Sequence, residues 1–159
     1  MADRWSLYET VGDWVAAGDA VTTDRSEPTL PNLVCNGAPI DDVRARLAEA
    51  DDIDEVDFKG WTGLHWALVR EVTDVIALLL DAGADPNKPT GTGRISLNIA
   101  MRSGQGDAVR LLLEAGADPE QADTDGKTPL MVGRAGKYPG LVAILREWGQ
   151  QGPLSGERI

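Results

Sequence analysis

The sequence predicts an all-α solenoid in which short helix–turn–helix units stack in a row and are joined by short hairpin loops. The first observation is that LLLDAGADP at residues 78–86 returns as LLLEAGADP at residues 111–119, with one acidic residue exchanged for another. The second is that other glycines and leucines recur at the same interval, namely Gly60, Gly93, Gly126, Leu64, Leu97 and Leu130. Self-similarity at a fixed period of about 20–50 residues is typical of stacked repeats.

Two apolar patterns in each unit predict its two helices. In the unit at residues 57–89, Leu64 and Leu68 share one helix face, and Ile76 and Leu80 share the face of a second helix. Turn residues separate the two patterns. A unit this short buries its apolar faces only against its neighbours, which is how a solenoid builds its core.

Glycines stand where the second helices are expected to end. Gly83 and Gly116 each follow a leucine run, one acidic residue and one alanine. Helices commonly end at a residue in the left-handed conformation, which glycine adopts without a Cβ penalty. We therefore expect both glycines to be structural.

The three units in phase resemble the ankyrin repeat. They read DFKGWTGLHWALVREVTDVIALLLDAGADPN, TGTGRISLNIAMRSGQGDAVRLLLEAGADPE and DTDGKTPLMVGRAGKYPGLVAILREWG, at residues 57–87, 90–120 and 123–149. The first two match most fully the family's D-x-x-G-x-T-P-L-H-x-A-A opening and its L-L-x-x-G-A-D-x-N ending. In the second unit Ile95, Ser96 and Asn98 stand where the family has T, P and H, which weakens the predicted helix cap.

The repeat frame divides the chain into three parts. Residues 1–28 are predicted to form an amphipathic helix and a linker, because apolar residues from Trp5 to Val15 recur at helical steps. That helix is expected to cap the stack, or alternatively to dock a partner. Residues 29–149 are predicted to hold about four repeats, at about 29–56, 57–89, 90–122 and 123–149, the first being a divergent cap. Residues 150–159 are predicted to be a polar tail.

The single histidine and the single cysteine are predicted to be structural. Thr62 and His65 lie three residues apart at a helix start, where their side chains can bond to backbone groups. Cys35 is expected in the core. One histidine and one cysteine offer no zinc spacing, and no phosphate loop or nucleophile motif occurs. The sequence therefore predicts no metal, no cofactor and no enzyme activity.

The net charge of −11, from 26 acidic and 15 basic residues, argues against nucleic acid and anionic membranes as partners. The apolar runs are too short to span a membrane, and the start MADRWSLYET lacks a basic and then apolar leader. We therefore expect a cytoplasmic protein that is a monomer when free. The densest acidic run, residues 49–57, lacks the glycine of a calcium loop and is an alternative docking site for a basic partner.

The resemblance implies a binding surface made of the hairpin tips and the exposed side of each first helix. Carried over to this sequence, the partner-binding positions are Phe58, Lys59, Trp61, Val69, Arg70, Arg94, Arg102 and Lys127. Five of these eight residues are basic, which predicts a basic concave stripe on an acidic chain. Trp61 is expected to be either an exposed hot spot or a cover for the capping unit, whereas Trp66 is expected in the core.

The predicted function is a non-enzymatic module that binds a partner protein. The partner does not follow from the fold. Two specific roles compete: an inhibitor or immunity protein that blocks a cognate toxin or enzyme, and an adaptor that holds a complex together. A third hypothesis, from a different class, is an enzyme or accessory catalyst with a site in the concave groove.

Overall fold

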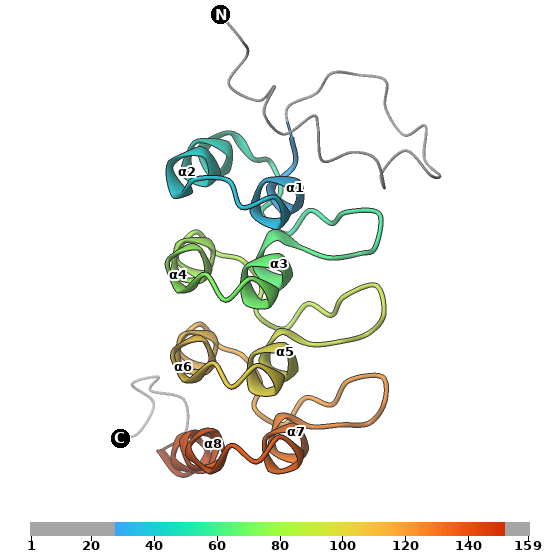
Figure 1. Ribbon diagram of the computed structural model, residues 1–159, viewed down its shortest axis with the longest axis vertical. Helices are drawn as coiled ribbons and strands as arrows, with labels where there is room; N and C mark the ends of the chain where they lie inside the picture. Colours follow the sequence, from blue (N-terminus) through green and yellow to red (C-terminus); the bar gives the residue numbers. More distant parts are fainter. Residues whose placement is uncertain (1–27, 152–159) are drawn as a thin grey trace, which may run out of the picture.

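The computed structural model describes residues 28–151, which form a stack of helix pairs in two layers. The first helices of the pairs are α1 (Leu30–Cys35), α3 (Gly63–Val69), α5 (Ser96–Arg102) and α7 (Pro129–Ala135). The second helices are α2 (Ile40–Glu49), α4 (Thr73–Asp81), α6 (Gly106–Glu114) and α8 (Pro139–Gln151). Figure 1 shows the pairs one above another, with the hairpin loops projecting to one side. The all-α solenoid prediction is confirmed for this part of the chain.

The predicted N-terminal amphipathic helix lies outside the described residues, as do residues 152–159 of the predicted tail. At the other end, α8 continues to Gln151, two residues beyond the predicted end of the last repeat at residue 149. Gln150 and Gln151 are good helix formers, so nothing in their sequence stops the helix there.

Threonine hydroxyls begin three of the four first helices. The side chains of Thr29, Thr62 and Thr128 each accept a hydrogen bond from the backbone N–H three residues later. The start of α5 has Ile95 instead, and no side chain caps it. The weakness predicted for this cap is confirmed.

The core is one cluster that runs along the stack. Fully buried side chains of one repeat are Leu64, Leu68, Ile76 and Leu79. Their counterparts in the next repeat are buried as well: Leu97, Met101, Val109 and Leu112. Each helix packs on its counterpart in the next repeat, so the stability of a repeat depends on its neighbours.

The glycines that follow α4 and α6 end these helices in the predicted way. Gly83 has φ of 100° and Gly116 has φ of 98°, both in the left-handed region. The N–H of Gly83 donates to the Leu80 carbonyl (3.0 Å), and the next N–H, of Ala84, donates to the Leu79 carbonyl (3.0 Å). These bonds satisfy carbonyls that the helix end would leave free.

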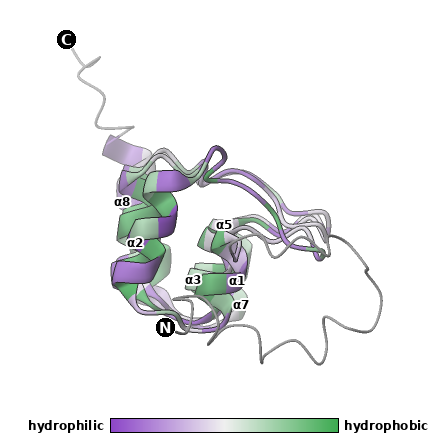
Figure 2. Ribbon diagram, turned by 90° about the horizontal axis from the view of Figure 1, so that it is seen from above, coloured by the Kyte–Doolittle hydropathy of each residue, from purple (hydrophilic) through white to green (hydrophobic). Residues whose placement is uncertain are grey.

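The hairpin loops pile onto one another. The N–H of Gly91 donates to the Gly60 carbonyl (2.9 Å), and the N–H of Thr124 donates to the Gly93 carbonyl (3.3 Å). A Cβ on Gly91 would lie 2.3 Å from the Lys59 carbonyl oxygen, so only glycine allows this approach. In the end-on view the loops of successive repeats nearly superpose (Figure 2).

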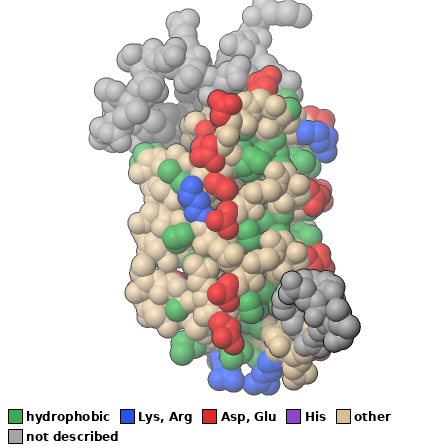
Figure 3. All heavy atoms as spheres, turned by 180° about the vertical axis from the view of Figure 1, so that it is seen from behind, with side chains coloured by type: hydrophobic (Ala, Val, Ile, Leu, Met, Phe, Trp, Pro, Cys, Tyr) green, Lys and Arg blue, Asp and Glu red, His purple; other side chains and the backbone are tan. Residues whose placement is uncertain are grey.

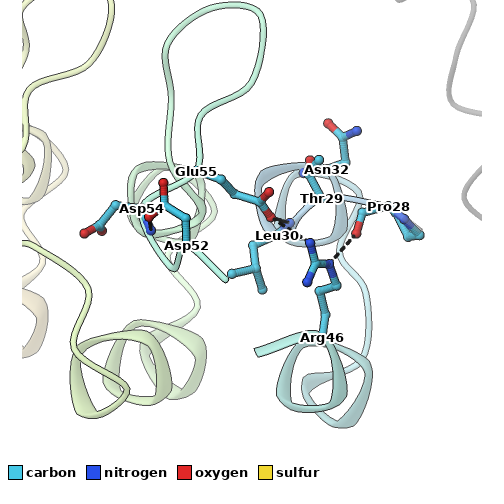
Figure 4. Close-up of polar contacts among 8 residues, drawn as sticks. All are labelled: Pro28, Thr29, Leu30, Asn32, Arg46, Asp52, Asp54 and Glu55. Carbon is cyan, nitrogen blue, oxygen red and sulfur yellow. Dashed lines mark hydrogen bonds and ion pairs between the residues drawn. The ribbon is translucent and has the colours of Figure 1, made fainter. Parts of the chain in front are cut away.

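Part of the acidic run at residues 49–57 ties the capping unit together, as Figure 4 shows. Glu55 Oε1 accepts the N–H of Leu30 (2.7 Å) and lies 3.6 Å from Arg46 Nη2. The Arg46 Nε–H donates to the Pro28 carbonyl (3.2 Å). These bonds fasten the start of α1 to α2 and to the turn that follows it, which gives this run a structural role.

Candidate functional site

A small pocket on the first-helix side of the stack is shared by three repeats. Its volume is about 160 Å³, and its lining residues are Trp61, Val69, Arg94, Asn98, Ile99, Arg102, Ser103 and Asp123. The first two come from the repeat at residues 57–89, Asp123 comes from the repeat at 123–149, and the others belong to the repeat between them. Four of the eight predicted binding residues therefore meet here: Trp61, Val69, Arg94 and Arg102.

Trp61 is half-buried, and its ring packs on its own repeat. It therefore does not fully match either prediction, the exposed hot spot or the cover for the capping unit. Its ring centroid lies 5.0 Å from that of Trp66 in a tilted arrangement, and 6.1 Å from that of His65 edge-on. Aromatic pairs at such separations are stabilising. These aromatic contacts fix the orientation of the Trp61 indole, and part of the indole lines the pocket.

Trp66 is also half-buried and packs against the core, so it lies at the edge of the core rather than fully inside it as predicted. The indole Nε1–H donates to Asp57 Oδ2 (2.8 Å) at the base of the hairpin. An indole N–H needs a hydrogen-bond partner when it leaves water, and this partner draws the ring toward the loop.

The aromatic surface continues from Trp61 and Trp66 toward the hairpin tip. The Lys59 ammonium lies 5.4 Å from the centre of the Phe58 ring and 5.7 Å from that of Trp66, within the range of cation–π attraction. Phe58 is 57% exposed, and Val69, at the pocket wall, is 45% exposed. Exposed apolar side chains beside a pocket are typical of a surface that binds a partner.

The predicted basic residues fall into two groups. Arg94 and Arg102 are exposed at the pocket, and within residues 28–151 neither guanidinium makes a hydrogen bond or an ion pair. Arg70 is also exposed, but its Nη1–H donates to the Cys35 carbonyl (3.0 Å) at the end of α1. Lys127 is exposed and is not part of the pocket lining.

Asn98 and Asp123 also line the pocket, although neither was among the eight predicted binding residues. Asn98 is 1% exposed, and its Nδ2 donates to Asp123 Oδ2 (3.1 Å) and to the Lys127 carbonyl (2.8 Å). Among the described residues, its Oδ1 has no hydrogen-bond partner, and neither has the buried hydroxyl of Ser96. The sequence signal that could have pointed to Asn98 was the departure from the family motif at residues 95–98.

Hydrogen bonds fix the Asp123 carboxylate. Burial alone would raise the pKa of this group, but bonds from the N–H of Lys127, from Asn98 Nδ2 and from the N–H of Asp125 hold the pKa below its usual value. The positive charge of Arg102 acts in the same direction. Asp123 is therefore a fixed negative charge at the pocket wall.

His65 has the structural role that the sequence predicted. Its Nε2–H donates to the Lys88 carbonyl (3.0 Å), because that oxygen can only accept, and Nδ1 then accepts the N–H of Thr62 (3.1 Å). Burial lowers the pKa of His65 to about 4, which keeps the imidazole neutral at physiological pH.

Cys35 is half-buried rather than fully in the core. Burial and the negative charge of Asp57 raise the pKa of its thiol. A raised pKa lowers the thiolate fraction, and the thiolate is the nucleophile. The residue therefore lacks the environment of a reactive cysteine.

The remainder of the described chain offers a second hollow of about 500 Å³ between α7 and α8. It belongs to the last described repeat and is lined in part by Arg134, Tyr138 and Arg146. Within residues 28–151, no group of three or more His, Cys, Asp or Glu side chains could hold a metal ion. None of the helices from α1 to α8 has the length and apolar character needed to cross a membrane.

Comparison with known proteins agrees with the repeat frame. The family model described as ankyrin repeats (3 copies) matches residues 28–123 and 79–151. Together the two matches run over well more than half of the 159 residues. A comparison with curated proteins found no match.

Proposed function

The chain belongs to the ankyrin-repeat family, and we propose that it is a non-catalytic module that binds a partner protein through its concave face and hairpin tips. Ankyrin repeats are in general protein–protein interaction modules. The proposal includes a monomer when free and a reducing, cytoplasmic setting, which the single half-buried cysteine favours.

The observation that carries this proposal is the surface around the small pocket. Exposed Phe58 and Val69 flank the half-buried Trp61, and beside them lie Arg94 and Arg102, which form no ion pair with any residue from 28 to 151. Tryptophan and arginine are over-represented among residues that dominate binding energy, especially next to apolar surface that excludes water. A cluster of this kind on a chain of net charge −11 supports the concave face as the binding site.

The opposite side of the molecule has a different character. Figure 3 shows acidic side chains in a line along the back of the stack. In the turns after α4 and α6, Asp85 and Asp118 accept the N–H of Asn87 (2.8 Å) and of Glu120 (2.9 Å). Because these carboxylates shape the turns, their recurrence follows from the repeat and does not require a partner.

Differential affinity capture from the source cells tests the proposal. The full chain, Val69→Glu and Arg110→Glu are tagged and compared by mass spectrometry. Val69→Glu places a charge on the concave surface without removing a buried side chain, and Arg110→Glu changes an exposed charge on α6 as a matched control. We expect a partner held by the wild type and by Arg110→Glu to be reduced roughly tenfold or more by Val69→Glu.

Equal capture by Val69→Glu and the wild type, with both proteins folded by circular dichroism, would reject the concave face. The identity of the captured protein then separates the specific roles. An enzyme or toxin inactivated at one-to-one stoichiometry indicates an inhibitor, whereas two proteins bound at once indicate an adaptor. Turnover of a substrate by the purified chain alone would contradict the non-catalytic assignment.

A further inference from the structure

We propose that the pocket formed by Trp61, Val69, Arg94, Asn98, Ile99, Arg102, Ser103 and Asp123 takes a glutamate or aspartate side chain from an acidic, partly apolar segment of the partner. This inference rests on the proposed function and names the chemistry of the bound segment. The volume of about 160 Å³ suits one side chain rather than a folded element.

The arginines supply the first part of the recognition. Arg94 and Arg102 lie on the same pocket, and within residues 28–151 no carboxylate forms an ion pair with either of them. The planar guanidinium presents N–H groups in a fork that matches a carboxylate. An incoming acidic side chain therefore does not need to break an existing ion pair of the stack.

Asp123 sets the charge that the pocket can accept. Its carboxylate is already held by Asn98 Nδ2 and by two backbone N–H groups, so it is a fixed part of the wall. Two arginines and one aspartate give the lined pocket a net charge of +1. One carboxylate neutralises that charge, whereas a phosphate group, at about −1.5 to −2, would exceed it.

Asn98, in the wall of the pocket, also has an acceptor that no described residue uses. Its Oδ1 is buried without a hydrogen-bond partner, on a residue that lines the pocket. A buried acceptor left unpaired costs about 1–3 kcal/mol, and backbone N–H groups are the donors that a bound peptide brings. The oxygen itself is covered, so a backbone N–H of the bound segment would pair with it only after a small shift of the pocket wall.

Apolar contact supplies the last part of the recognition. The Trp61 ring and the exposed Val69 lie at the same pocket as the arginines, and Phe58 extends the apolar surface toward the hairpin tip. An acidic residue in the pocket would thus place its chain neighbours over apolar surface. The segment that fits has an apolar residue next to the acidic one.

Titrations of the full, ¹⁵N-labelled chain with defined peptides test this inference. The probe is a short peptide of alternating glutamate and leucine, and the controls carry glutamine or lysine in place of glutamate. We expect the glutamate peptide to shift the Trp61 indole N–H signal and to bind roughly tenfold tighter than the glutamine peptide. The double change Arg94→Gln and Arg102→Gln should remove that preference, and the matched Arg110→Gln should leave it.

Equal binding of the glutamate and glutamine peptides would overturn the inference, as would an unchanged preference in the folded double variant. Preferential binding of a phosphoserine peptide or of single-stranded oligothymidylate at the same indole signal would overturn it too. Loss of partner capture in Val69→Glu without any glutamate preference would reject the carboxylate and leave the proposed function standing. A glutamate preference with capture unaffected by Val69→Glu would show that the pocket binds a carboxylate, but it would reject the concave face as the partner site and so overturn the claim that the carboxylate comes from the partner.

Discussion

The starts of α3 and α5 occupy the same place in consecutive repeats, but they are built differently. At α3, Thr62 and His65 bond to each other's backbone N–H, and the imidazole also reaches the next hairpin at the Lys88 carbonyl. At α5, Ile95 gives no cap, and Asn98 sends its amide to the next hairpin while its Oδ1 stays unpaired.

This difference shows that the same position can stabilise one repeat and contribute to a binding surface in the next. The α3 start satisfies its polar groups internally and lies beneath Trp61. The α5 start leaves two buried oxygens unsatisfied, on Ser96 and Asn98, and Asn98 lines the candidate pocket. Departures from local structural rules are expected to concentrate at functional sites, which supports the choice of this pocket.

The sharpest contrast comes from removing the imidazole. His65→Ala deletes the bonds to Thr62 and to Lys88 and leaves their buried N–H and carbonyl groups without partners. We expect it to lower the free energy of unfolding by about 3 kcal/mol, measured by urea denaturation. A loss no larger than that of Asn98→Ala would show that the two helix starts do not differ in their contribution.

Acid should expose the same contrast without a mutation. The pKa of His65 is about 4 in the folded protein and 6.5 in the unfolded chain. The contribution of the neutral imidazole to the free energy of unfolding is therefore fully present above pH 6.5 and is lost as the pH falls toward 4. From about pH 7.5 to about pH 5 the loss is about 2 kcal/mol. Urea titrations at these pH values measure it, and His65→Gln serves as the control. A slope that persists in the control would assign the effect to other groups.

Asn98→Ala should have a smaller effect. It removes two hydrogen bonds to the next repeat, but it also removes an oxygen that has no partner. We expect a loss of about 1 kcal/mol in the free energy of unfolding. The same variant should weaken the hold on Asp123, so the pKa of that carboxyl should rise, which carbon-detected NMR can follow. An unchanged pKa would mean that the backbone N–H groups suffice.

The smallest effect is a gain. Ser96→Pro removes a buried hydroxyl without a partner, and Ile95, at φ of −104° and ψ of 150°, already has a backbone compatible with a following proline. Proline suits the first helical position, so we expect a gain of about 0.5–1 kcal/mol. Pro129→Ser at the start of α7 is the reciprocal change and should lower stability in parallel thermal melts. A loss in both variants would show that the α5 start lacks room for the ring.

The fold was largely predictable because its information is local and repeated. The fixed interval between matching residues predicted the helices of residues 57–149 and the left-handed Gly83 and Gly116. The place of His65 in the first helical turn predicted its bond to Thr62, but not its bond to the Lys88 carbonyl. Propensity, helix capping and helix periodicity all act within one unit, and each unit repeats the signal.

The site was predictable only in part, because it depends on contacts between units. Family surface positions gave Trp61, Arg94 and Arg102, whereas the bond between Asn98 and Asp123 joins residues 25 apart. Arg70 reaches across 35 residues to a carbonyl, which a surface position in a repeat does not reveal. Such contacts depend on side-chain rotamers and on the fit of neighbouring repeats.

The hairpin-to-hairpin bonds limit how a chain of this kind can change its length. Gly91 is bonded to the Gly60 carbonyl and lies against the loop before it, and Thr124 is bonded in the same way to Gly93. An insertion of one or two residues in a single loop would shift its tip away from both neighbours. Duplication or deletion of a complete repeat unit preserves these contacts. Recombination between repeats therefore changes the binding surface with less damage to the hairpin contacts than small insertions within one repeat.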